Sequence, residues 1–206
     1  MGSYQLNEKE KELEATLCEV RKAHRLIYEY QRRMQDLTWY IKNKLEFSTY
    51  QGYKKFSAPI GDGRRISVEN WSWDWIYSYV YEYHLGYNNN GNVRGSLIQV
   101  SDTGFYDNEN AKATNLATYK KPEESRSLLI FYLLFSNDKQ LLESEWRPLE
   151  RLPQIRETVA TRPSNCYEII APIPLRNFLN EESTLNTLKN LIDYCKKQTG
   201  IAIAVL

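Results

Sequence analysis

The sequence has little of the residues on which metal and redox sites depend. It contains only two histidines, His24 and His84, and three cysteines, Cys18, Cys166 and Cys195, without a C-x-x-C spacing. A zinc site needs at least three converging protein ligands, so zinc chemistry is not expected. Three scattered cysteines also indicate no disulfide framework. We therefore predict neither a metal nor a cofactor.

Motifs that carry phosphate or acyl chemistry are missing as well. The segment Gly61-Asp62-Gly63 lacks a third glycine, and no G-x-x-x-x-G-K-[ST] loop occurs. No G-x-S-x-G nucleophile elbow is present either. Without a recognisable catalytic motif, a non-enzymatic protein is the favoured interpretation.

Neither charge nor hydropathy indicates a general affinity for nucleic acid or membranes. The formal net charge is +1, so no overall basic excess attracts the chain to phosphate groups. The longest apolar run, residues 128–135, is far shorter than the roughly 20 residues that span a bilayer. The first residues contain no apolar segment of the signal-peptide kind. We expect a cytoplasmic protein with no membrane partner.

The sequence does contain a long predicted helix with a seven-residue apolar repeat. Residues 7–46 include neither Pro nor Gly, and Asn7 followed by Glu10 resembles a capping box. The repeat consists of Leu6, Leu13, Val20, Ile27, Met34 and Ile41. A second row, four residues further on, contains Leu17, His24, Thr38 and Leu45. Together the two rows predict one apolar stripe along the helix.

The length of this helix favours self-association. Forty helical residues span about 60 Å, whereas a compact chain of this size is about 45 Å across. The helix therefore either breaks near Thr38–Trp39 or has a protruding end, and a protruding stripe most often pairs with a second copy. We predict a homodimer through residues 6–45. The alternative is that the helix packs wholly within its own domain. The heptad row three residues after the first row supports this alternative, because it contains the polar residues Lys9, Thr16 and Lys44.

The remaining residues predict an α+β domain at 48–206, following the helix at 1–47. A helix is expected at 181–198, capped by Asn180 and ended by Gly200. Strands are expected at 53–58, at 75–85 and 95–101 as a hairpin, and at 128–135, 167–172 and 201–206. The last two flank the helix as a strand–helix–strand unit, so the sheet of about five strands should be mixed although mainly antiparallel.

The most specific local pattern is an aromatic residue at every second position of one segment. The series consists of Trp71, Trp73, Trp75, Tyr77, Tyr79, Tyr81 and Tyr83. A period of two predicts a strand with one aromatic face. Such a face either packs in the core, where cross-strand aromatic pairs stabilise a sheet, or forms a contact surface for a partner.

We predict that this aromatic series, with Arg64 and Arg65 in the turn-rich segment before it, binds a partner. Tyr, Trp and Arg are enriched at protein interfaces. On the same strand Asp74 and Glu82 would repel a phosphate backbone, so another protein is favoured over nucleic acid.

Two other functions stay open. One is a nucleic-acid-acting protein, either a single-strand binder or a divergent metal-dependent nuclease using Glu82 and Asp102. The Glu-x-Lys signature of such nucleases is absent, since Gln99-Val100-Ser101-Asp102 stands where it would be expected. In the other, the aromatic residues form the core and the polar loop at 102–126 carries the function. The favoured prediction is an interaction or regulatory protein that dimerises through its helix.

Overall fold

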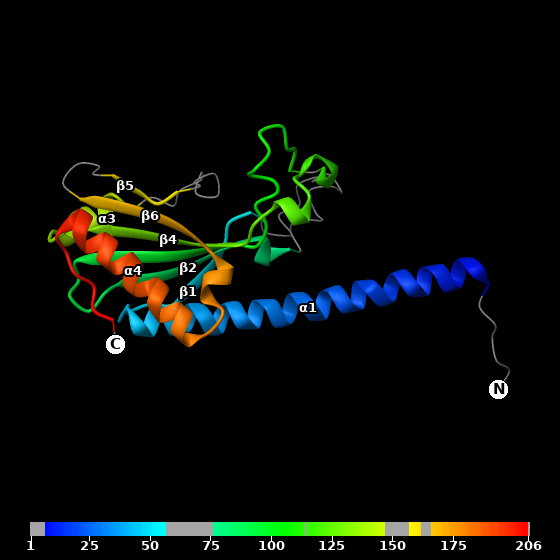
Figure 1. Cartoon of the computed structure of the whole chain (residues 1–206), viewed down its shortest axis with the longest axis horizontal. Coiled ribbons are helices and arrows are strands. Elements are labelled where there is room, and N and C mark those ends of the chain that lie inside the picture. Colours follow the sequence, from blue (N-terminus) through cyan, green and yellow to red (C-terminus); the bar gives the residue numbers. More distant parts are fainter. Residues whose placement is uncertain (1–6, 57–75, 114, 147–156, 162–165, 206) are drawn as a thin grey trace, which may run out of the picture. The chain divides into compact units, whose positions relative to one another are not determined.

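The computed structural model describes residues 7–56, 76–113, 115–146, 157–161 and 166–205 (Figure 1). The chain divides into two compact units, residues 1–37 and residues 38–206. Within the described residues no helix is both long enough and apolar enough to cross a membrane.

The first unit consists of most of helix α1, which runs from Glu8 to Lys44 without interruption. The Asn7 carboxamide oxygen accepts from the Glu10 amide at 3.0 Å, and the Glu10 carboxylate accepts from the Asn7 amide at 2.7 Å. This reciprocal pair confirms the predicted capping box. The break considered at Thr38–Trp39 does not occur, and the last turns of α1 belong to the second unit.

The second unit is built on a six-stranded sheet in which every pairing is antiparallel. The strand order is β1-β2-β3-β4-β6-β5. The strands are β1 (Gln51–Lys54), β2 (Val80–Tyr87), β3 (Val93–Val100), β4 (Leu128–Phe135), β5 (Val159–Thr161) and β6 (Tyr167–Pro174). The helices are α3 (Lys139–Ser144) and α4 (Glu181–Thr199), with single 3₁₀ turns at Tyr77–Tyr79, Leu116–Thr118, Pro122–Glu124 and Leu175–Phe178.

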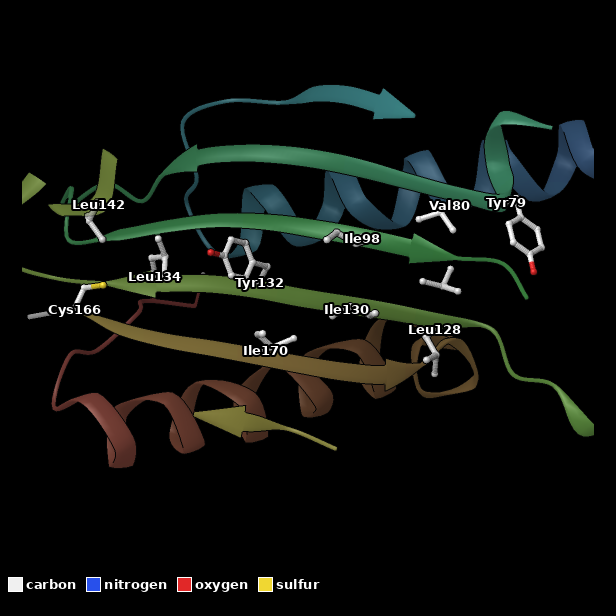
Figure 2. Packing of buried hydrophobic residues seen from close by; sticks show 11 residues of the cluster. Tyr79, Val80, Ile98, Leu128, Ile130, Tyr132, Leu134, Leu142, Cys166 and Ile170 are labelled. Atoms are coloured by element: carbon white, nitrogen blue, oxygen red, sulfur yellow. The ribbon is translucent and has the colours of Figure 1, made fainter. Parts of the chain in front are cut away.

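The two faces of the sheet are covered differently. On one face Phe131 stacks on Phe178, just before α4, with ring centroids 6.3 Å apart. We term this the helix face. The opposite face carries a core cluster that includes Leu142 of α3, and we term it the α3 face. Figure 2 shows this second cluster projecting from the sheet, with α4 on the far side. The central strand β4 is buried on both faces, which explains its unbroken apolar sequence.

The closing strand–helix–strand prediction was wrong in its last element. Residues 201–205 form no strand, although Ile203 is buried. The strand before α4, β6, already has β4 and β5 as its two neighbours. Both neighbours are antiparallel to it, so the sheet has six antiparallel strands rather than about five mixed ones. The predicted helix was confirmed, with Asn180 as its N-cap and Gly200 at a φ of 74° as its C-cap.

Prolines protect one edge of the sheet. The Leu175 amide donates to the Ser127 carbonyl at 2.9 Å. The backbone N–H and C=O groups of odd-numbered residues in β6 therefore face β4, and those of even-numbered residues face the opposite edge of β6. Beyond the short strand β5, that edge presents Pro172 and Pro174. Proline has no N–H to offer an added strand, so this edge resists strand addition.

Candidate functional site

The described part of the aromatic series does not form one continuous face. Residues 77–79 are a 3₁₀ turn, and regular β2 starts only at Val80. The strand predicted at 75–85 therefore starts later than expected, because the turn at 77–79 interrupts the alternation of side chains. The side chain of Tyr77 and the whole of Trp71, Trp73, Trp75, Arg64 and Arg65 lie outside the described residues, so their proposed contact role stays a prediction.

Two of the rings are part of the core and lie on opposite faces. Tyr79 is 6% exposed and packs 4.7 Å from Phe56 in the cluster of the α3 face (Figure 2). Tyr83 is 2% exposed and stacks on Tyr50 at 5.8 Å. Its hydroxyl donates to the Gln99 side-chain oxygen at 2.9 Å. Neither ring is therefore available on the surface for a partner.

Tyr81 is the one described ring of the series that keeps partial exposure. Its centroid lies 5.1 Å from that of Tyr83, so the two rings pack edge to face. Its hydroxyl occupies the space that a side chain at Gly52 would need, 2.2 Å from an ideal Cβ. Tyr81 thus lies against the edge strand β1, where part of the ring faces solvent.

A buried polar group on the α3 face joins strands β2 and β3 to the residue that follows β1. Glu82 of β2 is 5% exposed, and Lys55 lies 2.5 Å from its carboxylate. The Ser96 hydroxyl of β3 donates to the same carboxylate at 2.6 Å. His84 completes the group, with its Nδ1 atom 3.4 Å from the Ser96 oxygen. We term these four residues the polar group. Each charge in it has a compensating partner, as burial requires.

The environment of His84 disfavours its charged form. Burial is the main cause of a lowered pKa, and the guanidinium of Arg94 acts in the same direction. Glu82 opposes this shift and Lys55 adds to it. The imidazole is therefore neutral at neutral pH, which suits a ring packed 5.3 Å from Trp146.

Trp146 closes the α3 face beside the polar group. Its ring lies 4.8 Å from that of Tyr132 and 4.4 Å from the Arg94 guanidinium carbon. Arg94 also donates to the Leu142 carbonyl at 3.2 Å, which holds α3 against the sheet. Side chains therefore fill this region. They contribute packing and charge compensation and do not form an open reaction centre.

The structure does not bring Glu82 and Asp102 together. Glu82 pairs with Ile98, and Asp102 follows four residues later, about 13 Å along the strand direction. The Asp102 carboxylate accepts from the Gly104 amide at 2.7 Å. In the described residues no three His, Cys, Asp or Glu side chains form a group that could hold a metal ion.

A groove of about 340 Å³ runs between β6 and α4. Pro172 and Pro174 lie along one side, and Thr187, Leu191 and Tyr194 of α4 lie along the other. All of its described lining residues are uncharged. This lining selects no particular chemical class of ligand.

Several exposed apolar side chains lie on one face of α1. Leu13, Leu17, Val20 and Ile27 are between 42% and 59% exposed, and His24 is also exposed. The spacing of these five residues alternates between four and three, which places them on one face of the helix. We term them the α1 stripe. Ion pairs such as Arg21–Glu14, at 2.7 Å, lie at other positions of the helix and leave the stripe uncharged.

A family model described as PM0109 matches residues 10–200. The chain belongs to the PM0109 family. No curated protein and no solved structure matches it. The matched region runs from the first turn of α1 to the end of α4, so the long helix and the sheet are both part of what defines the PM0109 family.

In this PM0109 family member, sequence reasoning missed the polar group. The available signal was Glu82 and His84 alternating with tyrosines on one strand, which places both polar side chains on the same face. Their partners could not be predicted, because Ser96 comes from the register of β3 and Lys55 from the residue after β1.

Proposed function

We propose that this protein is a non-enzymatic interaction or regulatory protein that self-associates through α1. The observation that supports the proposal is the α1 stripe, four large apolar side chains exposed along one helix face. Contiguous exposed apolar patches on a soluble protein usually mark interaction sites. A stripe with alternating spacings of three and four residues fits another helix, and a second copy is the simplest such partner.

The size of the stripe sets the strength of the expected association. Full burial of a Leu, Val or Ile side chain contributes about 1.5–3 kcal/mol, and these residues are roughly half exposed before pairing. Two copies would then gain roughly 6–12 kcal/mol, against an association cost of about 4–15 kcal/mol. The difference is at most about 8 kcal/mol, so a micromolar dissociation constant is the tightest that the stripe supports.

The sheet offers weaker routes to assembly. One edge presents Pro172 and Pro174, which have no N–H groups for strand addition. The other edge, β1, has only four residues and ends in a lysine. Short, charged or proline-bearing edges are devices that prevent sheet-to-sheet pairing. The protected edges support α1 as the assembly element.

The second unit would carry contacts to another protein. Tyr81 is the described member of the predicted contact set that keeps an accessible ring, and Trp71, Trp73, Trp75, Arg64 and Arg65 remain its predicted companions. We also propose a cytoplasmic location, because all three cysteines are free and two of them are buried as thiols.

Substitutions on α1 test the proposal with a matched control. Val20→Glu combined with Ile27→Glu places charges in the stripe and should convert a dimer into a monomer in light-scattering measurements. Leu26→Glu is the control, because Leu26 is 71% exposed on the same helix but outside the stripe. Circular dichroism should show equal helix content in both proteins, since Glu is a good helix former. Dimers that persist in the double variant would contradict the proposal.

A further inference from the structure

The loop of the β2–β3 hairpin, residues 88–92, contains four asparagines and one glycine. Asn88 is buried, and its side-chain oxygen accepts from the Asn92 and Val93 amides at 3.1 and 3.0 Å. The Asn88 carboxamide also donates to the Asn92 side-chain oxygen at 3.0 Å. These two side chains therefore hold the loop together, and their amide groups are restrained by that role.

Asn89 and Asn90 have no such role, and both are exposed in the turn at the end of the hairpin. Neither side chain has a hydrogen-bond partner among the described residues. Asn90 differs from Asn89 because a glycine follows it, and Asn90-Gly91 is the one Asn-Gly pair in the sequence. Gly91 has a φ of 69°, and a Cβ added to it would have nothing within 4 Å beyond its chain neighbours. The main-chain nitrogen after Asn90 is therefore unhindered.

An unhindered main-chain nitrogen beside a free carboxamide has a defined chemistry. We infer that Asn90 is a site of spontaneous deamidation. The Gly91 nitrogen gives up its proton and bonds to the side-chain carbonyl carbon of Asn90. The carbon–nitrogen bond of the carboxamide breaks, and ammonia leaves with that proton. Water then opens the cyclic imide at either carbonyl, giving aspartate or isoaspartate, so one water is consumed and one ammonia is released.

One hydrogen bond of the loop opposes this reaction. The Gly91 amide donates to the Asn88 carbonyl at 2.9 Å, which restrains the nitrogen that has to attack. Hydrogen bonds at exposed loop tips open at a small cost in free energy, so this bond slows the reaction without preventing it. At Asn89 the attacking nitrogen would belong to Asn90, whose side chain hinders it. We therefore expect conversion at Asn90 and not at Asn89.

Conversion changes the loop in two ways. A carboxylate that is ionised at neutral pH replaces a neutral amide, so the formal net charge falls from +1 to 0. Isoaspartate also adds a carbon atom to the main chain just before Gly91. The turn bond from Gly91 to Asn88 then no longer fits, whereas the aspartate product keeps the main chain of the turn. The isoaspartate product should therefore have the less stable hairpin.

Ageing of the full-length protein tests the inference. Samples are kept at about 37 °C at pH 6 and pH 8, and peptide mapping by mass spectrometry follows residues 88–92. We expect aspartate and isoaspartate to accumulate at Asn90, several-fold faster at pH 8, because the deprotonated fraction of the attacking nitrogen rises with pH. The converted protein should also separate as an acidic fraction in ion-exchange chromatography. The reaction needs no partner, so its outcome is independent of the proposed self-association.

Asn90→Gln is the matched control, because its longer side chain would have to close a larger ring. Formation of the acidic fraction should fall several-fold in this variant, whereas Asn90→Asp should elute with that fraction from the start. Asn90 that stays unmodified throughout ageing would show that the turn bond blocks the reaction, and would overturn the inference. Equal conversion of Asn89 and Asn90 would overturn it as well, since the glycine would then have no effect.

Discussion

Glu82 is a nearly buried carboxylate, and its charge is compensated from two sides. Lys55 lies 2.5 Å from one oxygen, and the Ser96 hydroxyl donates to the other at 2.6 Å. Removing one partner of a buried ion pair is costly because the remaining charge is left uncompensated. We predict that Lys55→Met destabilises the fold by about 1–3 kcal/mol. The 32% exposure of the Lys55 side chain keeps this cost below that of a fully buried pair.

Urea unfolding measures this effect, with Lys189→Met on the exposed surface of α4 as the control. Adding Glu82→Gln to Lys55→Met should recover part of the loss, because a neutral amide needs no counter-charge. Equal stability of Lys55→Met and the control would show that the ion pair contributes little.

The lowered pKa of His84 links stability to pH. Burial disfavours the protonated ring in the folded protein, so the unfolded chain takes up this proton at higher pH. Stability should be complete above pH 6.5, the ordinary value, and fall as pH drops from there towards the lowered pKa. His84→Gln should make the stability difference between pH 7.5 and 5.5 smaller, as measured by urea unfolding.

The outcome for His84→Gln decides whether this residue causes the acid sensitivity. A His84→Gln protein with the same slope as the parent would mean that other groups cause the acid sensitivity.

Gly86 occupies a backbone conformation that favours glycine and has no room for a side chain. Its φ is 71°, and an added Cβ would lie 2.6 Å from the Thr49 hydroxyl oxygen. Gly91, in the same hairpin, has a φ of 69° but nothing within 4 Å. We predict a cost of about 2–4 kcal/mol for Gly86→Ala and about 1 kcal/mol for Gly91→Ala. Thermal unfolding compares them, and equal losses would mean that the contact with Thr49 is relieved without cost.

At the scale of elements, β2 shows why an alternating pattern does not by itself identify a surface. Tyr83 is in the core, whereas Tyr81 keeps one side exposed at the edge of the sheet. Tyr83→Ala should therefore cost about 3–5 kcal/mol, and Tyr81→Ala about 1–2 kcal/mol. Chemical denaturation measures both, and a larger loss for Tyr81 would contradict the described packing.

Elements with strong local signals could be predicted from sequence. Strand β4 was located by its apolar run at 128–135, and α4 by the Asn180 cap and the Gly200 stop. The position of the 3₁₀ turn at 77–79 could not be predicted, because the period-two pattern of aromatic residues continues through it. Residues 201–206 were predicted as a strand because they are apolar, yet the described residues 201–205 form none.

The α1 stripe and the polar group also differed in how far the sequence could predict them. The heptad rows contain the α1 stripe, but they also contain Met34, Thr38, Ile41 and Leu45, which are buried, so the sequence did not show where the exposed part ends. The polar group depends on which residues of β2 and β3 face each other, and this register is a long-range property of the sheet. Single-sequence patterns contain no information about that pairing.

At the scale of the whole molecule, a helix with an exposed apolar face accompanies a unit whose sheet edges resist pairing. The edge strands β1 and β5 have four and three residues, and Pro172 and Pro174 follow beyond β5. Assembly through the sheet is thereby disfavoured, which supports the proposed assembly through the helix.

The molar mass of the full-length protein in solution tests this account most directly. Sedimentation equilibrium over a dilution series from about 1 mM extends well above the micromolar dissociation constant that is the tightest the stripe supports. We expect a mass approaching twice the 24.3 kDa of one chain, falling towards 24.3 kDa on dilution. A constant mass of 24.3 kDa at every concentration would contradict self-association through α1.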